Sequence, residues 1–180
     1  MGSYRAAALI VFAYALAPIL SATGQAPGWH YSPLPGEGDR ASLGCARGST
    51  STDFTCLAVR CEDDYATGLY IHSSRPGGDA GRWEMTLDRE TRQMAARTDS
   101  GVYGARLDDP DGWLLDGLRH GSFVYLRHAD DKEGAFAFLD LSGSYRSITE
   151  ALQWCAPRVP PVEQIGEPGV GSKTDNGVAQ

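Results

Sequence analysis

The chain has 180 residues, a formal net charge of −7 and 42% hydrophobic residues, which fits one globular domain with a modest core. An acidic chain of this kind is a poor candidate for binding nucleic acid or an anionic membrane through a general electrostatic field. Lysine occurs only at positions 132 and 173, against many arginines, glycines and alanines, which is typical of a GC-rich bacterial genome.

The first 24 residues are predicted to form a secretory signal peptide. Arg5 precedes an apolar run over 6–20, and Ala22 and Gly24 place small residues at the two pocket positions of a signal peptidase. The run is shorter than the roughly 20 residues that a membrane-spanning helix needs, which disfavours the alternative of a retained anchor. We therefore expect a periplasmic or secreted protein with no membrane span after processing. Cleavage removes Arg5, the one charged residue of 1–24, and makes the chain one unit more negative.

Residues 25–156 are predicted to form a single domain, which begins with a lead-in over 25–40 that is rich in proline and glycine. Period-two alternation then predicts strands. Within 54–61 it places Leu57, Val59 and Cys61 on one face. Other strands follow from the same pattern and from turn residues, over 69–71, 83–87, 92–98, 122–128 and 135–141. The strand around 69–71 is expected to turn Tyr70 and His72 toward solvent.

Two segments have helical spacing. The first runs from Asp111 to His120, with Asp111 as its candidate cap and Gly121 as its end. The second runs from Ser144 to Trp154 and places Cys155 on its apolar stripe. The pattern as a whole predicts an α+β, mostly β fold, a small antiparallel sandwich or half-barrel with a short helix and a C-terminal helix tied to the sheet.

The four cysteines favour structural disulfides, because an exported domain is oxidised and the spacing of metal-binding or redox cysteines is absent from the sequence. Cys56 and Cys61 lie in one strand, about 17 Å apart, whereas a disulfide needs Cα atoms within about 7 Å. Cys61 shares the face of Leu57 and Val59. We therefore predict that Cys61 pairs with Cys155 and that Cys45 pairs with Cys56.

The tail over 157–180 is rich in proline and glycine and is predicted to be disordered. It contains GEPGVGSKT at 166–174, one residue away from a phosphate-binding loop. The sequence predicts neither a preceding strand nor a following helix there, so we interpret the match as chance.

No catalytic, cofactor or metal site is predicted from the sequence. His72, His120 and His128 are the best candidates for a site assembled from loops, but surface or capping roles are favoured. Asp109-Pro110-Asp111-Gly112 resembles the opening of a calcium loop, yet Pro110 disrupts its alternating ligands and the closing glutamate is missing.

Three acidic clusters fall where turns are predicted, and they are the candidate partner-binding residues. They are Glu62, Asp63 and Asp64; Asp108, Asp109 and Asp111; and Asp130, Asp131 and Glu133. Clustered carboxylates favour a partner with a basic surface.

The segment Leu57-Ala58-Val59-Arg60-Cys61, together with FAFLDLSGSYRSITEALQWC at 136–155, is similar to a pattern in small exported proteobacterial proteins that include the VasI-like family associated with type VI secretion. The resemblance covers about a quarter of the chain. It implies a β-rich domain closed by a helix that ends on a cysteine, and it transfers no catalytic residue.

These features favour a non-enzymatic binding or accessory protein of the bacterial cell envelope, with a link to a secretion system as one setting and another envelope or secreted protein as its partner. The alternatives are a small secreted hydrolase and a secreted inhibitor or effector. An exposed aromatic patch on one sheet face would favour binding. A cleft in which a histidine contacts a carboxylate would favour the hydrolase.

Overall fold

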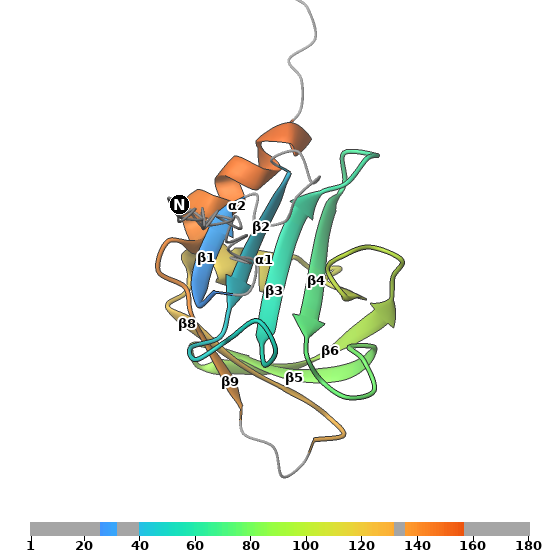
Figure 1. Ribbon diagram of the computed structural model, residues 1–180. Helices are drawn as coiled ribbons and strands as arrows, with labels where there is room; N and C mark the ends of the chain where they lie inside the picture. The colour runs from blue at the N-terminus through green and yellow to red at the C-terminus, as the bar shows by residue number, and fades with distance from the viewer. Residues whose placement is uncertain (1–25, 32–39, 132–135, 157–180) are drawn as a thin grey trace, which may run out of the picture.

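The computed structural model describes residues 26–31, 40–131 and 136–156 (Figure 1). The predicted signal peptide, the predicted tail and Glu133 lie outside the described residues. The strands are β1 (Gly28–Tyr31), β2 (Ala41–Cys45), β3 (Thr55–Cys61), β4 (Thr67–Ser73), β5 (Gly81–Leu87), β6 (Glu90–Thr98), β7 (Ala105–Leu107), β8 (Phe123–His128) and β9 (Ala137–Asp140). The helices are α1 (Trp113–His120) and α2 (Ser144–Leu152), and a 3-10 turn, η1 (Gln153–Cys155), follows α2.

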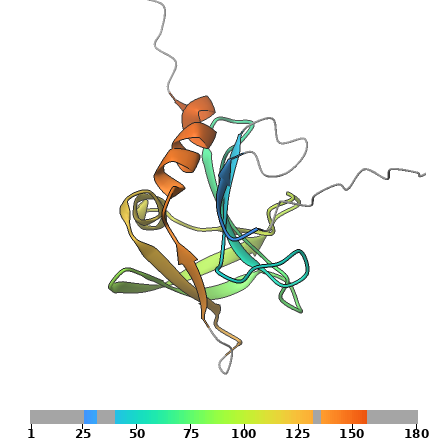
Figure 2. The same cartoon turned by 60° about the vertical axis from the view of Figure 1, so that its left-hand side comes forward.

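The nine strands form one open antiparallel sheet in the order β1-β2-β3-β4-β7-β6-β5-β8-β9. The sheet bends strongly, so the half with β1–β4 faces the half with β5, β6, β8 and β9, and α2 lies across the opening between them (Figure 2). The edge strand β9 is bonded to the other half of the sheet at two points. Trp29 Nε1 donates to the Asp140 carbonyl oxygen at 3.0 Å, and the Arg47 amide donates to the Phe138 carbonyl oxygen at 2.8 Å. The structure confirms the predicted fold class.

The main core fills the inside of the bend. It is built from inward side chains of both halves, and Leu57 and Val59 of β3 share it with Leu126 of β8, all three buried. Leu114 of α1 and Ile148 of α2 enter the same cluster from the open side. For β3, the alternation used to predict the strand is therefore the alternation that places Leu57 and Val59 in this core.

A second, smaller cluster lies on the opposite face of β2, β3 and β4. It contains Tyr70, which is 3% exposed, and Tyr103 from the loop between β6 and β7 packs 6.3 Å from its ring. The prediction that Tyr70 faces solvent is wrong, because β4 is covered on both faces and not on one. His72 is half-buried, with its ring 4.8 Å from that of Phe54.

Both disulfides have the predicted pairing. Cys45 and Cys56 are register partners on β2 and β3 and belong to the second cluster. Cys61, at the end of β3, is bonded to Cys155 with a Cα separation of 5.5 Å. The second bond therefore ties the segment after α2 to the sheet, as predicted.

The first helix begins two residues later than predicted, and its cap is a different residue. The chain turns through Gly112, which has φ of 73°, and this turn brings the carboxylate of Asp109 under the first turn of α1. Asp109 accepts the amide hydrogens of Leu114 and Leu115, each at 3.0 Å. Asp111 pairs with Arg92 instead. The prediction of Asp111 as the cap is wrong, whereas the end at Gly121 is confirmed.

Candidate binding site

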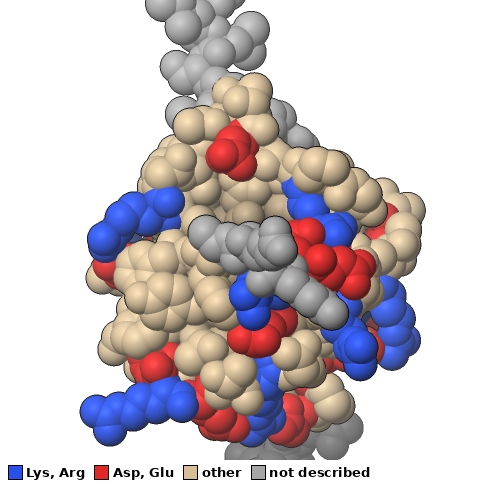
Figure 3. Space-filling view, turned by 90° about the horizontal axis from the view of Figure 1, so that it is seen from below, with Lys and Arg blue, Asp and Glu red and all other residues tan. Residues whose placement is uncertain are grey.

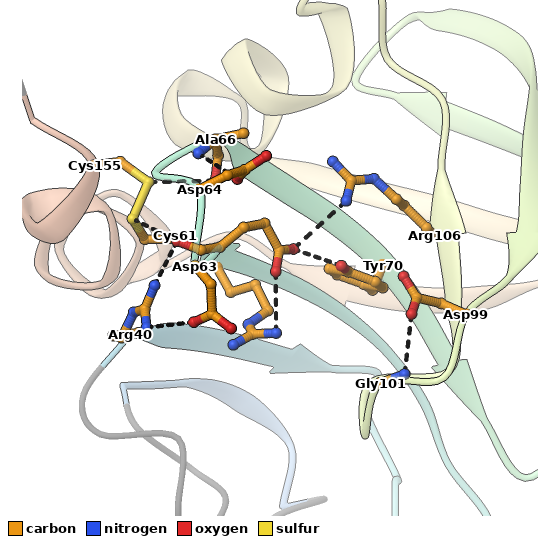
Figure 4. Close-up of polar contacts among 12 residues, drawn as sticks. Arg40, Cys61, Asp63, Asp64, Ala66, Tyr70, Asp99, Gly101, Arg106 and Cys155 are labelled. Carbon is orange, nitrogen blue, oxygen red and sulfur yellow. Dashed lines mark hydrogen bonds and ion pairs between the residues drawn. A yellow bond between two sulfur atoms is a disulfide. The ribbon is translucent and has the colours of Figure 1, made fainter.

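The first acidic turn is part of the framework (Figure 4). The side chain of Glu62 is 14% exposed, with Oε2 at 3.1 Å from Arg60 Nη1 and Oε1 at 3.8 Å from Arg106 Nη1. Tyr70 donates its hydroxyl to Oε1 at 2.5 Å. Burial, reinforced by the hydrogen bond to Glu62, holds the pKa of Tyr70 well above its ordinary value. These contacts use Glu62 to join β3, β4 and β7.

The other two residues of this turn also have contacts within the chain. Asp63 is 94% exposed and forms an ion pair with Arg40 at 2.8 Å. Asp64 accepts the amide hydrogen of Ala66 at 2.9 Å, the bond of a local Asx turn. Both contacts stabilise the connection between β3 and β4.

Arginines pair with the remaining acidic loops. Arg97 binds Asp108 at 2.5 Å, and Arg75 binds Asp131 at 2.8 Å. Asp130 lies 3.9 Å from the same guanidinium. The hydrogen bond from Arg75 lowers the pKa of Asp131 below its ordinary value. In the face that contains the turns between strands, most acidic patches lie beside basic ones (Figure 3). A partner-binding role for the acidic residues stays a prediction.

The candidate histidines lie in separate settings. His128 is 3% exposed; its Nε2 is 3.1 Å from the Ala80 carbonyl oxygen, and its Nδ1 accepts the Asp130 amide hydrogen at 3.2 Å. With both ring nitrogens bonded to the backbone, His128 holds two loops together. His120 is exposed, 3.8 Å from Asp116 on the same helix. Burial lowers the pKa of His72 below its ordinary value.

The structure instead brings four aromatic residues together at the β8–β9 hairpin, and we name this set the aromatic patch: Phe123 and Tyr125 of β8, Phe138 of β9, and Phe136 just before β9. The ring of Tyr125 lies 5.3 Å from that of Phe123 and 5.0 Å from that of Phe138. Tyr125 and Phe136 are 39% and 38% exposed. The patch is on the outer face of the sheet, because the intervening residues of β8 and β9 point into the core.

Two arginines stack on the patch. The guanidinium carbon of Arg47 lies 4.8 Å from the centre of the Phe138 ring, and that of Arg127 lies 4.2 Å from the centre of the Phe136 ring. The backbone bond from Arg47 to Phe138 holds the β2–β3 loop against the edge of β9 and so places the first of these side chains. Each stack adds a positive charge to an aromatic surface.

A pocket of about 420 Å³ lies between the aromatic patch and the loop after β2. Its lining includes Tyr125, Phe136 and Phe138 from the hairpin, and Arg47 and Asp53 from the loop between β2 and β3. The pocket has room for one or two side chains of a ligand. It combines an aromatic wall with one cation and one carboxylate.

The sequence contains a signal for this patch that our strand prediction did not use. In Phe123-Val124-Tyr125-Leu126 the apolar residues do not alternate with polar ones, so both faces of β8 are apolar. One face has to cover the core, and the other then presents aromatic rings at the surface. The position of Arg47 beside Phe138 could not be predicted, because it depends on how the two edges of the sheet approach.

Within residues 26–31, 40–131 and 136–156, no three His, Cys, Asp or Glu side chains are grouped so that they could hold a metal ion. No helix in the same part of the chain is long and apolar enough to cross a membrane. The chain matches no family model, no curated protein and no solved structure. The resemblance to the VasI-like family therefore stays a prediction.

Proposed function

We propose that this chain is an exported, non-enzymatic protein-binding module of the bacterial cell envelope and that the aromatic patch is its contact surface. One observation supports this most strongly: four aromatic side chains gather on an outer sheet face next to a pocket, with an arginine stacked on each of two rings. Tyrosine, phenylalanine and arginine are enriched in protein interfaces, and tyrosine and arginine dominate their binding energy.

The inclination of the rings favours a protein over a ligand that stacks in one plane. Tyr125 is inclined by 71° to Phe123 and by 52° to Phe138. A sugar ring or a nucleobase binds best to a flat aromatic face, which three mutually tilted rings do not offer together. A surface of tilted rings with a pocket beside it suits side chains that insert between them.

The framework beneath the patch is suited to binding because it is fixed in advance. The patch residues alternate with the buried Val124, Leu126 and Leu139, and the hydrogen bonds of Arg47 and Trp29 hold the edge of β9. A surface that is ordered before association loses less conformational entropy when the partner binds. The two disulfides suit an oxidising compartment, and the predicted leader and the resemblance to VasI-like proteins support an envelope or secretion-associated setting.

The test is capture of a partner from an envelope extract by the purified, oxidised protein. The wild type is compared with the double variant Tyr125→Ser/Phe136→Ser, and Tyr145→Ser is the matched control because Tyr145 is a 52% exposed aromatic residue on α2. We expect the wild type and the control to retain one or more proteins in similar amounts. The amount retained by the double variant should be at least tenfold lower, since a central tyrosine contributes about 2 kcal/mol to binding. Circular dichroism spectra of all variants serve as the control for folding.

Two results would overturn the proposal. Retained proteins that bind the double variant as well as the wild type would show that the patch is not the contact surface. Turnover of a peptide, glycan or ester substrate that His72→Ala, His120→Ala or His128→Ala abolishes would replace the binding module by the hydrolase.

A further inference from the structure

We propose that the aromatic patch recognises an extended polypeptide segment in which a hydrophobic side chain adjoins an acidic one, with the acidic group held by Arg47. This rests on the proposed function, because it names the ligand of the same surface. The hydrophobic side chain would enter the pocket against Tyr125 and Phe138, and the carboxylate would lie at its rim.

Arg47 is suited to bind the acidic group because its charged end is exposed to solvent and its backbone is held in place by a hydrogen bond. Its side chain is 74% exposed, and the Asp140 carboxylate lies 4.0 Å away, at the limit of an ion pair. By comparison, the side chain of Arg75 is 17% exposed and binds Asp131 at 2.8 Å. The stack on Phe138 orients the Arg47 guanidinium, so it can donate hydrogen bonds to a carboxylate without a large loss of side-chain freedom.

The second cation of the patch is already partly neutralised. Arg127 lies over the ring of Phe136, and Glu84 on β5 is 3.6 Å from its guanidinium. Glu84 therefore reduces the positive charge that Arg127 presents, and Arg47 is the more available of the two cations for a ligand carboxylate. The ligand needs one acidic side chain near the pocket and not a run of them.

The pocket also contains an acceptor for a peptide backbone. Asp53 lines the pocket and accepts the hydroxyl hydrogen of Ser74 at 3.3 Å through Oδ1. A carboxylate here repels a second acidic side chain and favours an N–H donor of the ligand. One cation and one acceptor on the loop beside an aromatic wall complement a segment with an acidic side chain, a hydrophobic side chain and free backbone amides.

This ligand differs from the basic partner expected from the acidic clusters. That expectation counted carboxylates such as Asp108 and Asp131, which the structure pairs with arginines of the same chain. The overall negative charge of the chain repels an acidic ligand at long range. The attraction therefore comes from Arg47 within a Debye length of about 8 Å, where the local charge dominates.

The experiment uses a library of random 12-residue peptides displayed on phage, selected on the immobilised wild-type protein. Selected peptides are synthesised, and their affinities are measured by calorimetry for the wild type, for Tyr125→Ser/Phe136→Ser, for Arg47→Gln and for the control Arg146→Gln, whose side chain is 86% exposed on α2. Each acidic residue of a peptide is also replaced by its amide. We expect peptides that contain a hydrophobic residue next to Asp or Glu, and both the amide peptide and Arg47→Gln should weaken binding about tenfold.

The double-mutant cycle combines Arg47→Gln with the amide peptide, and together with Tyr125→Ser/Phe136→Ser it distinguishes failure of this inference from failure of the proposed function. If the amide substitution has no further effect in Arg47→Gln, the carboxylate binds Arg47 as proposed. If the peptides depend on Tyr125 and Phe136 but not on an acidic residue or on Arg47, this inference is wrong and the proposed function stands. If no selected peptide loses affinity for Tyr125→Ser/Phe136→Ser, both are wrong.

Discussion

The bond between Cys61 and Cys155 should contribute more to stability through the unfolded chain than the bond between Cys45 and Cys56 does. It spans 94 residues, and the other spans 11. The chain-entropy model then gives about 4.7 kcal/mol for the long loop and about 3 kcal/mol for the short one. Burial acts in the opposite direction, because each buried sulfur lost costs about 1 kcal/mol. Cys45 and Cys56 are both buried, whereas in the other bond Cys61 is buried and Cys155 is partly exposed.

The two paired alanine variants should therefore lose similar totals, about 6 kcal/mol for Cys61→Ala/Cys155→Ala and about 5 kcal/mol for Cys45→Ala/Cys56→Ala. The distribution of the loss over the molecule is the sharper test. Urea unfolding gives the totals, and hydrogen exchange gives the distribution. In Cys61→Ala/Cys155→Ala the amides at the end of α2 and in η1 should exchange faster than those of β5 and β8. In Cys45→Ala/Cys56→Ala the amides of α2 should keep their protection relative to the sheet. Equal local exchange at α2 in both variants would refute the view that the long-range bond holds the helix to β3.

Three smaller perturbations test the packing around the site. Ser42 and Ser147 share a buried hydrogen bond of 2.7 Å, so either alanine variant should lose about 1–3 kcal/mol in chemical denaturation, while the double variant should lose less than the sum. Burial lowers the pKa of His72, so the unfolded chain takes up a proton before the folded chain does as the pH falls below about 6.5. The free energy of unfolding should therefore decrease from pH 7.5 to 5.5, and His72→Gln should make that decrease smaller. A Cβ at position 44 would clash with the indole of Trp29, so Gly44→Ala should shift tryptophan fluorescence and cost about 1–3 kcal/mol, and an unchanged spectrum would contradict the packing.

The sequence was sufficient for the parts of the fold that rest on one-sided burial. Trp83, Met85 and Leu87 alternate with polar residues, and β5 occurs where this pattern predicts it. The disulfides could be predicted for the same reason, because the face of β3 that contains Leu57 and Val59 also contains Cys61. Local periodicity and strand geometry determine both results.

The features of the fold and of the site that could not be predicted depend on contacts between distant segments of the chain. Tyr70 lies on the predicted face of β4 but is buried there, because Tyr103, more than thirty residues later, covers β4 from outside. The strands β2 and β7 were not predicted, since ASLGC and ARL are short and contain few large side chains. In the candidate site, the aromatic rings of β8 are evident in the sequence, but the arginine stacked beside them comes from a loop about eighty residues earlier.

The central claim is that partners bind at the aromatic patch, and site-specific photo-crosslinking in the producing cell tests it most directly. A photoreactive benzoylphenylalanine replaces Tyr125 in one strain and Tyr145 in a second, since both side chains are exposed and they lie on β8 and α2. We predict a discrete, irradiation-dependent adduct with another protein at position 125 and none at position 145. An adduct at position 145 alone, or no adduct at position 125, would contradict the claim.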